Sequence, residues 1–158
     1  MNFDSAFHKL LGHEGGFSDH KDDPGGATCW GVTEQVARAS GYTGDMRQLP
    51  VQLAKDIYRQ KYWDAVRADE LPAAVRYQVF DAAVNSGVGQ SIRWLQRALG
   101  VADDGKLGAV TLGKAHTEDP QALVRKLLAQ RLRFMTDLKN WPSFSRGWAR
   151  RIADLMEA

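Results

Sequence analysis

The sequence predicts a mainly α-helical, two-lobed domain with a small loop or hairpin region after the first helix. Apolar residues recur at helical spacing over most of the 158 residues, whereas one stretch near the N-terminus lacks this periodicity and is rich in glycine and proline. Hydrophobic residues make up 44% of the chain and charged residues 25%, a balance typical of one folded, soluble domain. The turn over residues 103–108 is the place where two lobes could divide.

The first helix is predicted by apolar residues at helical spacing, namely Phe3, Phe7, Leu10 and Leu11. Asn2 or Asp4 can cap it, and it should end near His13 or Glu14 because two glycines follow. Helical periodicity is then absent up to about Thr33. Residues 22–26 read Asp-Asp-Pro-Gly-Gly, which predicts a loop, with a short hairpin.

Helical patterns return over residues 33–40, 50–61, 72–86, 89–99, 108–115, 120–138 and 145–156. Two of these segments carry apolar stripes that predict core positions. The stripes are Val75, Val79, Phe80 and Ala83 in one, and Leu123, Leu127, Leu128, Leu132 and Met135 in the other.

The formal charge is only +2, but cations crowd the last third of the chain. They include Arg125, Lys126, Arg131, Arg133, Lys139, Arg146, Arg150 and Arg151. Such a face would attract an anionic polymer such as bacterial wall or nucleic acid, and salt would weaken the attraction. The alternative interpretation is an ordinary solvated helix face.

Cys29 is the only cysteine, so no disulfide can form within the chain and packing must hold the fold. The first residues show no cationic start followed by an apolar run, and no stretch approaches 18 apolar residues. We therefore expect neither a signal peptide nor a membrane span.

Glu14 stands where the first helix is expected to end. The carboxyl end of a helix carries a partial negative charge, which disfavours a carboxylate by roughly 0.3 to 1 kcal/mol. The same repulsion would raise the pKa of Glu14 and keep a proton on it near neutral pH. A general acid needs this property.

Asp23 is the natural second carboxyl group. Cleavage of a glycosidic bond usually employs one carboxyl group that protonates the leaving oxygen and another that stabilises the oxocarbenium-like state, attacks it or activates water. Asp23 lies in the loop after the helix, and Thr28 offers a hydroxyl that can position water. Asp22 is the alternative to Asp23.

The order Glu, Asp, Thr resembles that of phage lysozymes. Eight residues separate Glu14 from Asp23, and four separate Asp23 from Thr28, one fewer than in those enzymes. Several segments together resemble the glycoside hydrolase family 108 muramidases. These are Glu14-Gly15-Gly16-Phe17, residues 23–28, Trp30-Gly31-Val32-Thr33, Tyr58, Tyr62-Trp63, Leu71-Pro72 and residues 80–87.

This resemblance implies a lysozyme-like fold and cleavage of the bond between N-acetylmuramic acid and N-acetylglucosamine, with Glu14 at the catalytic position and no cofactor. Residues 1–87 would form the catalytic part of one domain spanning residues 1–158. Residues 95–100 and 104–111 resemble a peptidoglycan-binding helical repeat, so residues 88–158 would be peptidoglycan-binding-like. The alternative is purely structural: a helix end, a turn and the next helix.

Aromatic rings stack on sugar faces, so Trp30, Tyr62 and Trp63 are candidates for binding substrate, against the alternative of ordinary burial. Asn85 is a further candidate, because its amide could hydrogen-bond an N-acetyl group or instead cap its helix. We expect no metal. His13-Glu14 lacks the second histidine of a zinc-protease motif, since position 17 is Phe17.

Three functions remain open: a muramidase, a lytic transglycosylase and a non-catalytic peptidoglycan-binding module. Asp23 and Thr28 favour the muramidase, because a transglycosylase uses the sugar's own hydroxyl and needs no water-directing partner. We expect a monomer that acts on peptidoglycan in the periplasm or cell wall, as in lysis by a phage or prophage. It would leave the cytoplasm through a holin pore or a secretion route, without nucleic acid or stable membrane insertion.

Overall fold

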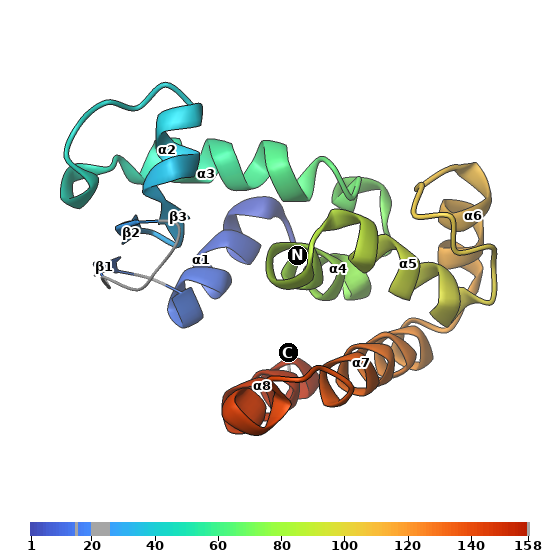
Figure 1. Cartoon of the computed structure of the whole chain (residues 1–158). Helices are drawn as coiled ribbons and strands as arrows, with labels where there is room; N and C mark the ends of the chain where they lie inside the picture. Colours follow the sequence, from blue (N-terminus) through green and yellow to red (C-terminus); the bar gives the residue numbers. More distant parts are fainter. Residues whose placement is uncertain (15, 20–25, 158) are drawn as a thin grey trace. The chain divides into compact units, whose positions relative to one another are not determined.

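The computed structural model describes residues 1–14, 16–19 and 26–157 (Figure 1). For His13 and Glu14 it describes the backbone but not the side chain. The chain divides into two compact units, Met1–Trp63 and Asp64–Ala158, each with its own core. Helices dominate both units, and the described strands form one small sheet after the first helix. The predicted mainly α fold with a small hairpin region is therefore confirmed.

The first unit combines three helices with the sheet (Figure 1). Its elements are α1 (Phe3–Glu14), β1 (Phe17–Ser18), β2 (Thr28–Cys29), β3 (Val32–Thr33), α2 (Glu34–Ala39), a 3-10 turn (Met46–Gln48), α3 (Val51–Tyr58) and a π-helical turn (Arg59–Trp63). The sheet is antiparallel in the order β1-β2-β3, and Thr28 lies opposite both Ser18 and Thr33. The end of α1 at Glu14 confirms the predicted boundary.

The core of the first unit is built on the apolar stripe of α1. Phe3, Phe7 and Leu10 are buried, as predicted. The Phe7 ring lies 5.5 Å from the Tyr58 ring, edge to face, so α1 packs against the end of α3. Edge-to-face ring pairs of this kind stabilise a core beyond the area they bury.

The π-helical turn differs from the single helix predicted over residues 50–61. It extends α3 by the wider spacing of a π-helix, which occurs in single turns and often at functional sites. Tyr62 remains half-buried while the next side chain, Trp63, is fully buried. Local apolar spacing does not reveal such a change of helical period.

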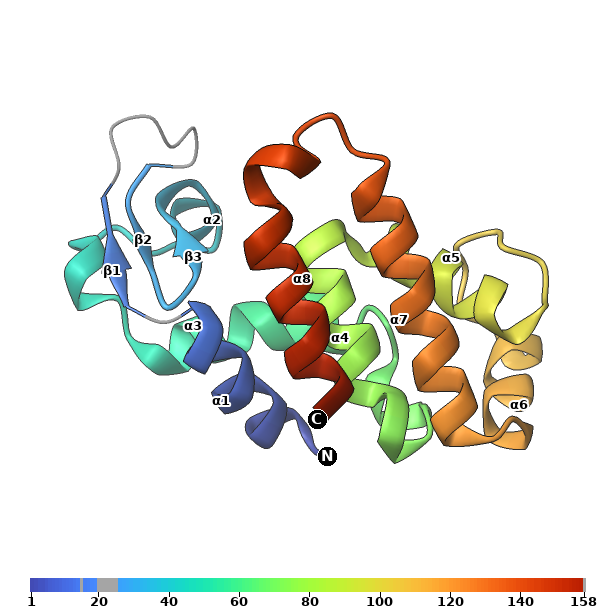
Figure 2. The ribbon, with the colours of Figure 1, turned by 90° about the horizontal axis from the view of Figure 1, so that it is seen from below.

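The second unit is helical in all its described elements. They are a 3-10 turn (Ala68–Glu70), α4 (Ala73–Ser86), α5 (Val88–Leu99), α6 (Ala109–Thr117), α7 (Pro120–Thr136) and α8 (Trp141–Glu157). Helix α4 packs against α5 and α7, and α7 also packs against α5 and α8. Figure 2 shows α7 and α8 side by side across α4. Helix α4 is therefore the central helix of this unit, and it is buried on several sides.

Most of the predicted core positions are confirmed. All four residues of the first stripe are buried on α4, and so are Leu123, Leu127 and Leu128 on α7, whereas Leu132 and Met135 are only half-buried. Helix α8 begins at Trp141, four residues before the predicted start at residue 145. Pro142 fits there, because proline is tolerated in the first turn of a helix.

The predicted basic face is smaller than the sequence suggests. Arg131 is buried, with its Nη1 2.7 Å from Oδ2 of Asp81, and the Arg151 Nη2 lies 2.7 Å from Oδ1 of the same carboxylate. Both arginines therefore serve an ion pair inside the second unit. They do not form part of an exposed cationic surface.

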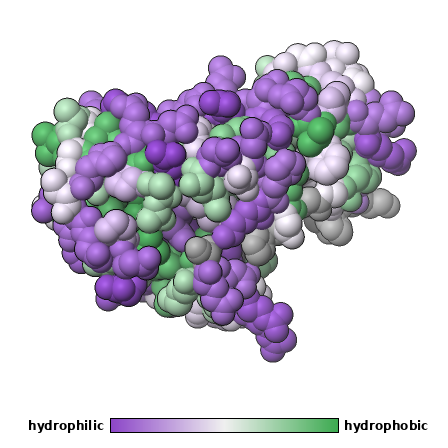
Figure 3. Space-filling model, turned by 180° about the vertical axis from the view of Figure 1, so that it is seen from behind, coloured by the Kyte–Doolittle hydropathy of each residue, from purple (hydrophilic) through white to green (hydrophobic). Residues whose placement is uncertain are grey.

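One face of the molecule is mostly hydrophilic. On the face shown in Figure 3, hydrophilic residues cover most of the area and hydrophobic residues form separate patches. In the described part of the chain, no helix has the length and apolar character needed to cross a membrane.

Candidate active site

Glu14, the predicted general acid, is the last residue of α1. The buried side chains of Phe7 and Leu10 fix α1 in the core, so the backbone at its carboxyl end has a defined place in the first unit. The side chain of Glu14 lies outside the described part of the structure. Its predicted role therefore stays a prediction.

Thr28, the predicted water-positioning residue, begins the central strand β2. Its backbone pairs with Ser18 of β1 and with Thr33 of β3. The half-buried side chain donates a long hydrogen bond of 3.4 Å from Oγ1 to the carbonyl oxygen of Ser18. Such a weak bond leaves the hydroxyl able to rotate towards another acceptor.

Asp23, the predicted second acid, and its alternative Asp22 lie outside the described residues. In the sequence they stand between β1, which follows Glu14, and β2, which begins at Thr28. The choice between the two aspartates stays open.

Trp30 occupies a strained hairpin turn. The turn between β2 and β3 contains only Trp30 and Gly31, both with positive φ, at 53° and 71°. This pair of angles matches the type I′ turn that suits two-residue hairpins, but a bulky side chain rarely adopts it. The Trp30 indole N–H donates to the Leu49 carbonyl at 2.9 Å, which holds the ring in place. Strain of this kind often occurs at ligand sites, which supports Trp30 as a substrate-binding candidate.

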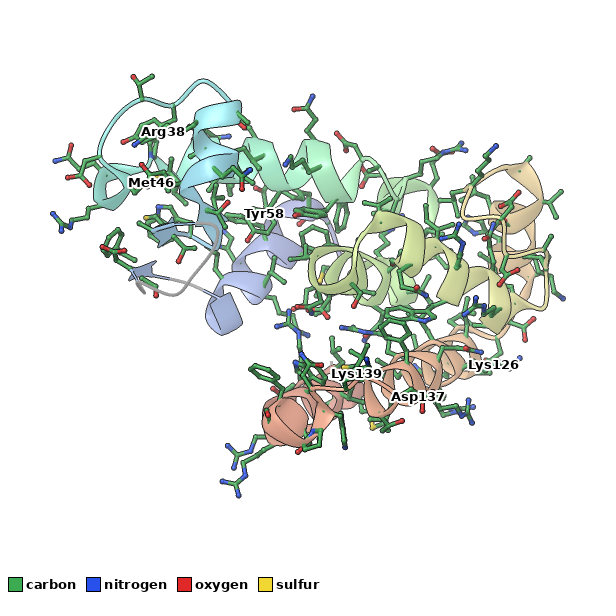
Figure 4. All side chains as sticks on the ribbon, viewed as in Figure 1. Arg38, Met46, Tyr58, Lys126, Asp137 and Lys139 are labelled. Atoms are coloured by element: carbon green, nitrogen blue, oxygen red, sulfur yellow. The ribbon has the colours of Figure 1, made fainter. Side chains whose placement is uncertain are left out.

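Tyr62 lines a small hollow of about 80 Å³ in the first unit. The walls come from β3 and the residues beside it, Gly31 to Val36, and from Ile57 and Tyr58 at the end of α3. Figure 4 labels Tyr58, whose ring lies 5.6 Å from that of Tyr62. Tyr62 therefore faces a cavity directly after the Trp30 turn, and it stays a substrate-binding candidate.

Trp63 does not fit its predicted role. Its side chain is fully buried, and its ring packs edge-on against Phe3 at 5.6 Å. A ring without exposed surface has no face to offer a sugar, so the prediction of direct substrate contact is corrected. Burial, the alternative considered for this residue, describes its position.

Asn85, the fourth predicted binding residue, is exposed near the end of α4 in the second unit. Its Nδ2 lies 3.3 Å from Oδ2 of Asp81 and donates to it, one turn earlier on the same helix. The helix ends instead at Gly87, whose backbone N–H donates to the Ala83 carbonyl. The amide of Asn85 is therefore engaged with Asp81 rather than with a helix cap.

Asp81 is the most deeply buried acid of the described structure, and no local signal in the sequence indicates its role. Burial by itself raises the pKa of Asp81, but the two arginines Arg131 and Arg151 outweigh this effect, so the pKa lies below its ordinary value. The carboxylate therefore remains ionised and joins α4 to α7 and α8. The role of Asp81 is structural, because both of its carboxylate oxygens are engaged by Arg131 and Arg151.

Gln96 was also missed, although it lies in the segment that resembles a peptidoglycan-binding repeat. Its buried amide Nε2 donates to Oδ1 of Asp104 at 2.8 Å and to the Lys106 carbonyl at 3.0 Å. Its Oε1 accepts from the Gly105 N–H at 2.9 Å. The Gln96 side chain therefore stabilises the turn between α5 and α6 through these hydrogen bonds. A polar residue on the apolar face of α5 was the available signal.

Among the described residues, no group of three or more histidine, cysteine, aspartate or glutamate side chains could hold a metal ion. The side chains of His13 and His20 lie outside that part.

Comparisons with known proteins cover nearly the whole chain. The sequence profile of the glycosyl hydrolase 108 family matches residues 7–87, and that of a predicted peptidoglycan domain matches residues 90–153. A search of curated proteins gave no match. Among solved structures, SagA of Brucella abortus is similar with a TM-score of 0.87 and 33% sequence identity, over 98% of this chain and 91% of SagA.

The two profiles divide the chain near residue 88, whereas the compact units divide after Trp63, because α4 packs with α5 and α7. The division into a catalytic and a binding part therefore stays a prediction. One profile is that of a glycosyl hydrolase and the other that of a peptidoglycan domain, so together they support an enzyme that acts on peptidoglycan. The chain belongs to the glycosyl hydrolase 108 family, and it is a glycoside hydrolase that acts on peptidoglycan.

Proposed function

We propose that the protein is an N-acetylmuramidase, a lysozyme that cleaves the β-1,4 bond between N-acetylmuramic acid and N-acetylglucosamine. The observation that carries this proposal is the position of Glu14 at the end of α1, three residues before the start of the sheet in which Thr28 begins the central strand. A carboxyl group at the carboxyl end of a helix keeps its proton more readily. A glycosidase needs such a group to protonate the leaving oxygen.

In this mechanism Glu14 donates its proton to the glycosidic oxygen as the bond from that oxygen to the anomeric carbon breaks. Asp23, with Thr28, orients a water molecule on the opposite face of the sugar. Asp23 takes a proton from the water as the water oxygen bonds to the anomeric carbon. The product has inverted configuration, and the two carboxyl groups are expected about 6.5 to 9.5 Å apart. Asp22 is the alternative base.

The products of digestion test the reaction type. Purified peptidoglycan treated with the protein should yield fragments with reducing N-acetylmuramic acid ends, detected by mass spectrometry. Proton NMR of the first products should show the α anomer, which reports inversion. Anhydro-muramic ends would mean a lytic transglycosylase, and the absence of new fragments would mean a binding module.

Two single variants test the base. Asp23→Asn should reduce the rate of fragment release by roughly 10²-fold or more, as expected for a lost general base. Asp22→Asn, which removes a carboxyl group from the neighbouring position, is the matched control and should retain most of the rate. The reverse result would assign the base to Asp22.

We also propose that the enzyme serves bacterial lysis by a phage or prophage and reaches the wall from the cytoplasm through a holin pore. Expression in bacteria should then cause lysis only when a holin is produced together with it. Lysis without any pore would instead indicate a different export route.

A further inference from the structure

A cationic hollow of about 690 Å³ lies in the second unit, between the ends of α5 and α6 and one face of α7. We call it the basic groove. Among its described lining residues are five cations and one acid, which are Arg97, Lys114, Arg125, Lys126, Arg133 and Glu118. Figure 4 labels Lys126 on α7. The groove is electropositive, and it is distinct from the proposed cleavage site, whose catalytic residues all belong to the first unit.

Three of the five cations have local partners. The Nε of Arg97 donates to Oδ2 of Asp103 at 2.6 Å. Glu118 pairs with Lys126 at 3.0 Å and with Lys114 at 3.5 Å. These partners lower the pKa of Glu118, chiefly through the hydrogen bond from Lys126, so Glu118 stays ionised at neutral pH. Ion pairs within the second unit therefore explain the presence of these three cations.

Arg125 and Arg133 have no such explanation. Both are exposed on α7, and neither makes an ion pair with any described carboxylate, including Asp137, which lies one turn beyond Arg133. Arg133 stands in the last turn of α7, where the helix dipole favours a cation, whereas Arg125 stands in the second turn, where it does not. Eight residues of helix separate them by about 12 Å along the axis, with Ala129 and Gln130 lining the groove between them. Within the described part of the chain, two guanidinium groups thus line one groove without a carboxylate partner.

We propose that the basic groove binds the stem peptide of peptidoglycan, with Arg125 and Arg133 each receiving one of its carboxylates. A guanidinium group is planar and can donate two parallel hydrogen bonds to a carboxylate. The stem peptides carry several carboxylates along a short chain, whereas the amino sugars between them are neutral. The described lining contains no aromatic ring on which a sugar could stack. The charge of the groove and the residues that line it therefore favour the peptide over the glycan.

The sequence comparison supports the same ligand. Every residue of the groove named above lies within residues 90–153, the part that matches a predicted peptidoglycan domain. The proposal rests on peptidoglycan being the substrate, and it adds the part of the polymer that is recognised and the residues that recognise it. Binding there would hold the enzyme on the wall between cleavage events.

The test measures binding of a soluble stem tetrapeptide, L-Ala-γ-D-Glu-diaminopimelate-D-Ala, to the full chain by isothermal titration calorimetry. The double variant Arg125→Ala/Arg133→Ala should weaken binding at least 10-fold. The matched control is Arg146→Ala/Arg150→Ala, which removes two exposed arginines from α8, outside the groove, and should change binding less than 2-fold. The same peptide with amidated carboxyl groups should bind the unsubstituted protein at least 10-fold more weakly.

Equal binding by both double variants, or equal binding of the free and amidated peptides, would overturn the proposal. Tighter binding of a DNA oligonucleotide than of the peptide, lost in the same groove variant, would replace it with a different polyanion. Circular dichroism and the Tm of both double variants should match the unsubstituted protein, because all four arginines are exposed.

A kinetic readout separates this inference from the proposed cleavage. On purified peptidoglycan, Arg125→Ala/Arg133→Ala should raise KM about 5-fold or more while kcat changes less than 2-fold. If the unsubstituted protein released no fragments, the proposed muramidase activity would fail. The peptide-binding measurement would still decide the role of the groove.

Discussion

Asp81 illustrates how a single buried charge organises the second unit. Its carboxylate is 1% exposed, and it accepts hydrogen bonds from Arg131, Arg151 and Asn85. Replacing a buried ion pair with apolar groups is often neutral, but removing one partner leaves a charge without compensation. The positive charge of Arg131, 2% exposed, would remain in the core.

We therefore predict that Asp81→Asn destabilises the protein by about 3 to 5 kcal/mol. Urea denaturation followed by circular dichroism measures this change. Asp137→Asn, at an exposed acid on the loop after α7, is the control and should stay within about 0.5 kcal/mol of the unsubstituted protein. A loss below about 1 kcal/mol for Asp81→Asn would mean that the ion pair does not hold these helices together.

Cys29 offers a second test at the residue scale. It lies on β2, 5% exposed, and burial raises the pKa of its thiol. Since the thiolate is the reactive form, we predict that the folded protein reacts with a thiol reagent far more slowly at pH 8 than it does in 6 M guanidinium. Rapid labelling of the folded protein, close to the rate of the unfolded chain, would contradict the described sheet.

At the scale of elements, Gln96 connects α5 to the turn that leads into α6. The turn requires glycine at position 105, where φ is +74°, and the side chain of Gln96 satisfies the backbone N–H of that glycine. It also satisfies the side chain of Asp104 and the carbonyl of Lys106. The side-chain amide of Gln96 therefore stabilises the turn through several hydrogen bonds.

We predict that Gln96→Ala destabilises the protein by about 1 to 3 kcal/mol, because buried groups lose their partners. Hydrogen exchange should show faster exchange at the Gly105 amide, with little change in α4. Gln90→Ala, on the first turns of α5, is the control and should leave exchange at Gly105 unchanged. Unchanged exchange in Gln96→Ala would show that the turn is stable without this support.

Most helices could be predicted from the sequence because each carries its own apolar period and end signals. Gly15-Gly16 marks the end of α1, and Gly100, with φ of +69°, ends α5 as its position predicts. The π-helical turn at Arg59–Trp63 has no such local signal; its last residue, Trp63, packs against Phe3, a residue far away in the sequence.

The candidate site shows the same division between local and long-range signals. Glu14 and Thr28 are placed by local motifs, and their positions at a helix end and a strand start follow from neighbouring residues. The sequence alone does not distinguish a buried aromatic residue from an exposed one, so the prediction of substrate contact for Trp63 is wrong. Local sequence likewise does not show that Arg131 is buried, because its partner Asp81 is 50 residues away.

At the scale of the whole molecule, the protein should lose stability at low pH as the Asp81 carboxylate becomes protonated. Because the pKa of Asp81 in the folded protein lies below its ordinary value of 3.8, its contribution to stability is present above pH 3.8 and is lost as the pH falls through the folded-state pKa. We predict that the Tm difference between the unsubstituted protein and Asp81→Asn is constant from pH 6 to about pH 5 and shrinks towards pH 2. A difference that grows in acid would have the wrong sign.

The central claim for the whole molecule is that Glu14, in the first unit, is the catalytic acid of the proposed muramidase. The most direct measurement is mass spectrometry of fragments released from purified peptidoglycan by the unsubstituted protein and by Glu14→Gln, which keeps the side chain's shape and removes its acidic proton. We predict reducing-end fragments from the unsubstituted protein and at least a 10³-fold lower rate, roughly the scale of a lost general acid, from Glu14→Gln. Equal release by both proteins would show that Glu14 is not the catalytic acid.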